Sequence, residues 1–154
     1  MIEDVEHLLI EKPLALIYWD LEEDLSPVET FLTSQKGLEV KRINSLKELI
    51  YWFNIGEVSV IVLGTESLEK VKDFKLFLDN KLPVEKRRKI QIIYVTAGLK
   101  TLHPKEVFLL SANLIVSKEH LSEFPRAFEK ALKYWEFLYK PFNKALQKVM
   151  EEEL

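Results

Sequence analysis

The chain has 154 residues, of which 47% are hydrophobic and 31% are charged, and its formal net charge is −3. This length and composition suit one globular domain with a real hydrophobic core, and they exclude an intrinsically disordered chain. The negative charge argues against a general nucleic-acid-binding protein, the lack of cysteine excludes disulfides and thiolate metal sites, and the apolar runs are far shorter than the ~20 residues of a membrane helix.

The first quarter of the chain predicts a helix, a strand and a second helix. Residues 2–11 carry apolar side chains three or four positions apart, which predicts a short amphipathic helix. Residues 14–20, LALIYWD, are almost continuously apolar, as in a strand that is covered on both faces of a parallel sheet. Ser26 followed by Pro27 predicts a helix with a serine N-cap, and Gly37 is a natural end for it.

The rest of the chain continues the alternation of strands and helices. The further expected strands span residues 38–43, 58–64, 89–98 and 112–118. The further expected helices span residues 45–56, 66–80, 104–111 and 122–152. Asn44 or Ser45 is the expected cap of the first of these helices, and Pro141 should kink or break the last one.

Five strands that alternate with helices predict a parallel α/β sheet with right-handed crossovers and helices on both faces. We find no internal repeat, low-complexity tract or change of composition that would divide the chain. We therefore expect a single domain of residues 1–154. It consists of an N-terminal helix (1–12), a core (14–133) and a C-terminal helical extension (134–154).

Three segments resemble response-regulator receiver domains. Residues 92–98, IIYVTAG, resemble the fourth receiver strand, which ends in Thr or Ser followed by Ala. Residues 111–118, SANLIVSK, resemble the segment that ends in the lysine of that family, and residues 16–20, LIYWD, resemble the first strand, which ends in two adjacent acids. The resemblance implies a flavodoxin-like, CheY-like three-layer sandwich with a five-stranded parallel sheet in the order 2-1-3-4-5.

The resemblance also implies where a phosphorylation site would lie. A receiver accepts a phosphoryl group on an aspartate at the end of its third strand. Mg²⁺ bridges this aspartate to the acids after the first strand, and a Thr or Ser and a Lys bind phosphoryl oxygens. Asp20 matches the second acid, Thr96 matches the hydroxyl and Lys118 matches the lysine.

The chain departs from the receiver pattern at the positions that phosphotransfer requires. Trp19 stands in place of the first acid, and the phosphoacceptor falls at Leu63 or Gly64, neither of which can be phosphorylated. Ile115 stands at the aromatic switch position, and Glu119 replaces the proline that normally follows the lysine. These departures predict a degenerate site without phosphotransfer.

Each matched residue also has an ordinary structural explanation. Asp20 could be a residual metal- or phosphate-site acid, or it could cap the following turn. Thr96 could bind a ligand oxygen, but a hydrogen bond to local backbone is favoured. Lys118 is expected to form a structural ion pair with Asp20. Weak Mg²⁺ binding at Asp20 is conceivable, helped by the acids of residues 22–24, but no metal or other cofactor is expected.

Two further features have modest predicted roles. The basic run of residues 86–89, KRRK, is interpreted as a solvated entry to the fourth strand. The C-terminal helix carries an aromatic stripe that continues beyond what a receiver sheet can cover, so it needs a partner. The residues expected on this interaction surface are Phe108, Phe128, Trp135, Tyr139 and Phe142.

The leading hypothesis is a non-enzymatic, cytoplasmic pseudo-receiver that acts without phosphorylation. It would bind a protein partner or form a homodimer through the C-terminal helical face, without nucleic acid or membrane. Its richness in Lys and Glu is compatible with a thermophilic source. One alternative is a small flavodoxin-like enzyme or ligand-binding domain that uses Asp20, Thr96, His103 and Lys118. Another is a structural subunit of a larger assembly.

Overall fold

The computed structural model describes residues 12–81, 89–96, 113–134 and 136–137, and they contain one five-stranded sheet. All neighbouring strands are parallel, and their order is β2-β1-β3-β4-β5. The strands are β1 (Leu14–Trp19), β2 (Glu39–Arg42), β3 (Val58–Gly64), β4 (Gln91–Thr96) and β5 (Leu114–Ser117). The predicted fold class, a flavodoxin-like sheet in the order 2-1-3-4-5, is confirmed.

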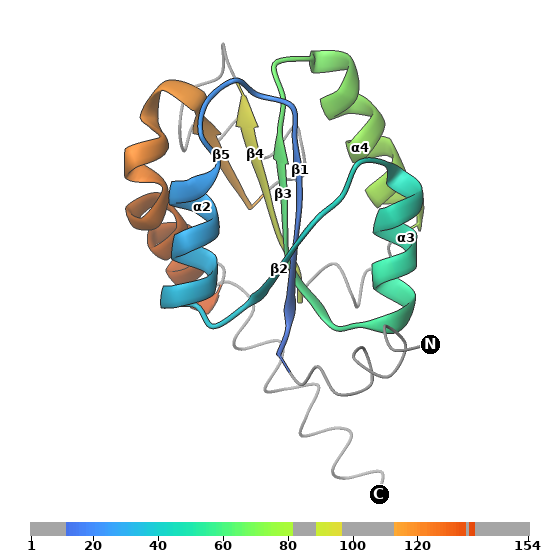
Figure 1. Cartoon of the computed structure of the whole chain (residues 1–154), viewed down its shortest axis with the longest axis horizontal. Helices are drawn as coiled ribbons and strands as arrows, with labels where there is room; N and C mark the ends of the chain where they lie inside the picture. The colour runs from blue at the N-terminus through green and yellow to red at the C-terminus, as the bar shows by residue number, and fades with distance from the viewer. Residues whose placement is uncertain (1–11, 82–88, 97–112, 135, 138–154) are drawn as a thin grey trace, which may run out of the picture.

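Helices cover both faces of this sheet (Figure 1). One face is covered by α2 (Ser26–Thr30), which continues into the π-helical turn η1 (Phe31–Gln35), and by a helix formed by residues 124–134 and 136–137, here called the C-terminal helix. The other face is covered by α3 (Leu46–Ile55) and α4 (Leu68–Lys81). A 3₁₀ turn, η2 (Lys118–Glu123), leads from β5 to the C-terminal helix.

The three central strands are buried on both faces because each face has its own apolar core. Side chains that alternate along β1, β3 and β4 point in turn to the α2 side and to the α3–α4 side. On the α2 side, Phe31 packs edge-on against Phe124 and Phe128, with ring centroids 5.9 and 5.3 Å apart. Burial on both faces explains why these strands are almost continuously apolar in sequence.

The observed helix ends agree with those predicted from the sequence, except for the N-cap of α2. The predicted N-cap, Ser26, is the first helical residue, and the carboxylate of Asp24 accepts hydrogen bonds from its N–H (3.0 Å) and its hydroxyl (2.8 Å). These bonds lower the pKa of Asp24. Gly37 has a φ of 65°, which confirms its role as a helix stop because this conformation favours glycine. Ser45 caps α3 and accepts a hydrogen bond from the N–H of Glu48.

Several expectations lie outside the described residues. They include the helices of residues 2–11 and 104–111, most of the basic run 86–89, and the chain beyond residue 137. The division into an N-terminal helix, a core and an extension therefore stays a prediction. Within the part of the chain that the structure describes, no helix combines the length and the apolar character that crossing a bilayer requires.

The two-sided core predicts a large difference between two Leu→Ala substitutions. Leu16 lies in β1 and is 0% exposed, whereas Leu76 lies on α4 and is 62% exposed. We expect Leu16→Ala to lower the free energy of unfolding by about 2–5 kcal/mol, because it leaves a cavity in the core. We expect the matched control Leu76→Ala to change it by less than about 0.5 kcal/mol. Urea unfolding of the two variants measures this difference, and equal losses would contradict the assigned burial.

Candidate functional site at the carboxyl edge of the sheet

The carboxyl ends of β1 and β3 lie side by side and determine which residues meet there. The register pairs Trp19 with Gly64, and the N–H of Asp20 donates to the carbonyl of Gly64 at 2.9 Å. The residue after Gly64 is Thr65, and its N–H donates to the carbonyl of Val95 at 3.0 Å. This pairing places Asp20 beside the loop that leads from β3 to α4.

Asp20 is bound by groups from that loop and from α4. Its Oδ2 accepts a hydrogen bond from the hydroxyl of Thr65 (3.1 Å) and forms an ion pair with Nζ of Lys70 (2.6 Å). Nζ of Lys70 also donates to the hydroxyl of Tyr18 at 3.0 Å. The hydrogen bond to Asp20, followed by the one to Tyr18, raises the pKa of Lys70 above its ordinary range. Asp20 therefore connects the end of β1 to the first turn of α4.

Lys118 forms a second ionic cluster instead of pairing with Asp20. Its ammonium group is paired with Glu66 and lies 3.1 Å from Oε1 of Glu23. The hydrogen bond to Glu66, then that to Glu23, raises the pKa of Lys118. The hydrogen bond from Lys118 is in turn the main reason that the pKa of Glu23 is lowered.

The predicted Lys118–Asp20 pair is therefore wrong, because each residue meets a nearer partner that sequence spacing did not reveal. Glu23 comes from the β1–α2 loop and Glu66 from the β3–α4 loop, so Lys118 links three loops at the carboxyl edge. Lys70 is the residue at the carboxyl edge of the sheet that sequence reasoning missed. Its signal was weak, because one lysine among several on a charged helix has no distinguishing pattern.

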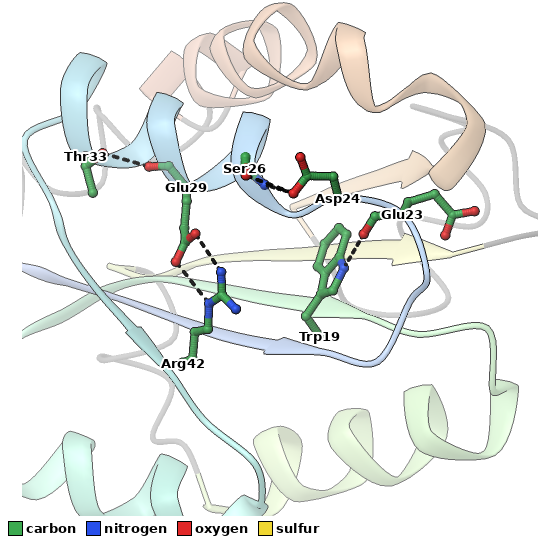
Figure 2. Close-up of polar contacts among 7 residues, drawn as sticks. All are labelled: Trp19, Glu23, Asp24, Ser26, Glu29, Thr33 and Arg42. Carbon is green, nitrogen blue, oxygen red and sulfur yellow. Dashed lines mark hydrogen bonds and ion pairs between the residues drawn. The ribbon is translucent and has the colours of Figure 1, made fainter.

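Trp19 fills the space beside Gly64. The indole rises from the end of β1 on the α2 side, and its Nε1 donates to the backbone carbonyl of Glu23 at 2.9 Å (Figure 2). A Cβ atom at position 64 would lie 2.2 Å from Cε3 of this indole and 2.6 Å from Cζ3. No side chain fits at position 64 unless the rigid ring moves, because real contacts of this kind are longer than 3.0 Å.

The two possible phosphoacceptor positions thus have different surroundings. Leu63 is 1% exposed and belongs to the core under α3 and α4, together with Ile115, which is 0% exposed. Gly64 ends the strand next to Trp19. Ile115, at the position of the aromatic switch, is a core residue here.

Among the residues that the structure describes, the hydroxyl of Thr96 has no hydrogen-bond partner, although the side chain is only 1% exposed. The residues that follow Thr96 lie outside the described part of the chain, so the expected bond to local backbone stays a prediction. Thr96 is paired with Ser117 in the β4–β5 ladder, one residue before Lys118. A buried hydroxyl without a partner is costly and uncommon, which makes Thr96 the least satisfied residue among the matched site positions.

The arrangement does not fit Mg²⁺ of the receiver type. The positions that the resemblance assigns to two further carboxylates hold Trp19 and either Leu63 or Gly64, and the remaining acid, Asp20, is paired with an ammonium group. Among residues 12–81, 89–96, 113–134 and 136–137, no group of three or more His, Cys, Asp or Glu side chains is placed to hold a metal ion.

The ion pairs of Lys70 and Lys118 disfavour the alternative of an acid–base site. Raised pKa values keep Lys70 and Lys118 protonated at neutral pH, so neither ammonium group is poised to act as a base or nucleophile. Asp20 and Lys118 belong to different ionic clusters, and His103, the proposed partner in that site, lies outside the described residues.

The predicted interaction surface changes on the C-terminal helix. Phe128 is only 4% exposed and packs in the core against Phe31, so its assignment to that surface is wrong. Tyr134 and Phe137 are 68% and 80% exposed. Sequence reasoning missed these two because they lie beside the apolar stripe rather than on it. Phe108, Trp135, Tyr139 and Phe142 lie outside the described residues.

Several chains of solved structures are similar to this chain, and one of them is an orphan response regulator. The crystal structure of HP1043, an orphan response regulator of H. pylori, superposes with a TM-score of 0.49 at 12% identity, over 75% of this chain and 95% of that chain. No family model matches the chain, and no curated protein matches it. A similarity of this degree does not establish membership of a family.

The contact between Trp19 and position 64 predicts a strong coupling between two substitutions. We expect Gly64→Ala to lower the free energy of unfolding by about 1–3 kcal/mol, because the added methyl group collides with the indole. In a Trp19→Ala background the same substitution should cost much less, since the ring is gone. Urea unfolding of the four proteins in this double-mutant cycle measures the coupling, and additive effects would contradict the assigned contact.

Proposed function

We propose that this chain is a receiver-like signalling module that works without phosphorylation and acts by binding another protein rather than by catalysis. The observation that carries the proposal is the end of β3. Of the two positions at which the acceptor could fall, Leu63 is 1% exposed in the core, and at Gly64 the indole of Trp19 occupies the space in which a side chain would stand. Both the nucleophilic carboxylate and the room for it are missing.

The charges around this position support the same proposal. In the receiver family, a phosphoryl group and a metal ion draw the loops of the carboxyl edge together. In this chain the lysines supply that link, since Lys70 joins β1 to α4 and Lys118 joins the loops of Glu23 and Glu66. The edge is cross-linked by residues of the chain itself, so its conformation does not depend on an added phosphoryl group.

The C-terminal helix offers the surface on which a partner would bind. Tyr134 and Phe137 are one helical turn apart and expose large aromatic side chains. Lys130 and Lys133 are exposed on the same segment. Glu136 is exposed there as well. Large aromatic residues are enriched on protein-binding surfaces, so this face favours a partner with apolar side chains.

The first prediction from this proposal concerns chemistry. Incubation with acetyl phosphate and Mg²⁺ should leave the intact mass unchanged, because no carboxylate stands at the acceptor position. Intact-protein mass spectrometry measures this, with a receiver domain that retains its aspartate as the positive control. A stable phosphoryl adduct on any aspartate of the carboxyl edge would overturn the proposal.

The second prediction concerns the partner. The double variant Tyr134→Ser/Phe137→Ser should lose the proteins that the wild-type chain captures from a lysate of its source, whereas the matched control Leu76→Ser should keep them. Leu76 is 62% exposed, but it lies on the opposite face of the sheet. Circular dichroism should show that all three proteins are folded. The same set of captured proteins for both variants would exclude the C-terminal helix as the binding surface.

A further inference from the structure

A cavity of about 190 Å³ lies at the amino edge of the sheet, opposite the edge described above. It opens between the C-terminal helix, the first residues of β3 and β4, and the chain between η1 and β2. Its apolar walls are formed by Leu38, Val60, Phe128 and Leu132. The space is larger than a single water molecule needs.

One wall of this cavity carries a buried amide. Gln91, the first residue of β4, lines the cavity and is only 6% exposed, yet its Nε2 has no hydrogen-bond partner among the residues that the structure describes. Leaving a buried donor unsatisfied costs free energy, so such a group needs an explanation. A ligand with an acceptor oxygen would provide it.

The other polar groups that line the cavity are cationic or neutral. Lys36 and Lys89 line it, and none of the described lining residues carries a carboxylate. The ammonium group of Lys36 is paired with Glu129 and lies 5.5 Å from the ring centroid of Phe128. Lys89 makes no ion pair with any of the residues that the structure describes. It is the last residue of the basic run KRRK.

A β-bulge brings a hydroxyl to the same place. Leu14 pairs with Val58 but Ala15 pairs with Val60, so Ser59 is an extra residue in the β1–β3 ladder. Ser59 lines the cavity beside Val60, whose partner in the next ladder is Gln91. Bulges of this kind redirect side chains and are frequent near functional sites.

We propose that this cavity binds a small organic anion with one carboxylate and a short aliphatic tail. The carboxylate would accept hydrogen bonds from the amide of Gln91 and from Lys89, while the tail would lie against Val60, Phe128 and Leu132. An uncharged ligand would leave Lys89 unused, and an anion without a tail would leave the apolar walls uncovered. Because Phe128 and Leu132 belong to the C-terminal helix, the occupied cavity would add contacts between that helix and the sheet.

The test uses isovalerate as the probe for the full chain. Titration followed by ¹H–¹⁵N NMR should give saturable shifts of the Gln91 side-chain amide. The neutral analogue isovaleramide and the tail-free anion formate should each bind at least about tenfold more weakly, since each loses one of the two kinds of contact.

Two variants and a matched control separate this site from general charge effects. Lys89→Ala and Gln91→Leu should each weaken isovalerate binding about tenfold, the change expected for one lost charge-assisted hydrogen bond. Lys72→Ala, which removes an exposed lysine of α4 on the opposite face of the sheet, should leave it unchanged. Lys89 is exposed, so its variant should fold normally even if Gln91→Leu does not. Absent saturation, equal binding of isovaleramide, or equal affinity of the Lys89→Ala and Lys72→Ala variants would overturn the proposal.

Discussion

The structure depends on one constraint, which is that the central strands of a parallel sheet must be covered on both faces. β4 is buried at every position, and β3 at all but Ser59. Two separate cores result, one under α2 and the C-terminal helix and the other under α3 and α4. Each helix is held by the apolar stripe that it contributes to one of these cores. The strand ends are therefore fixed in space, and the loops that follow them meet at the carboxyl edge.

At that edge the register of β1 and β3 decides what is possible. Pairing Trp19 with Gly64 places an indole beside a residue that has no side chain. The lack of a Cβ atom at position 64 leaves the space that the indole fills. The charged residues around this pair then neutralise one another. Asp20 is paired with Lys70, and Glu23 and Glu66 are paired with Lys118. Such ion pairs at a partly exposed edge contribute modestly to stability, and they fix the relative positions of three loops.

The C-terminal helix follows η2 at the carboxyl edge and also lines the cavity at the amino edge. Near its start, Phe124 and Phe128 anchor it in the α2-side core, and Phe128 also lines the amino-edge cavity. Further along, Tyr134 and Phe137 face away from the sheet. A single element thus carries a core face, a wall of the cavity and an exposed aromatic face. A contact made at any of these three surfaces would change how strongly the C-terminal helix packs against the sheet.

Periodicity and residue type are local properties, so the sequence predicts the alternation of strands and helices, the parallel sheet and the helix stop at Gly37. The strand order was predicted from the resemblance to receiver domains, as was the position of the missing acceptor. Which charges meet is a property of the tertiary structure. Lys118 was expected to pair with Asp20, but it forms ion pairs with Glu23 and Glu66, which belong to two other loops. The burial of Phe128, the exposure of Phe137 and the burial of Gln91 depend likewise on how helices pack on the sheet. Distances between residues far apart in the chain arise from packing, and spacing along one sequence does not contain them.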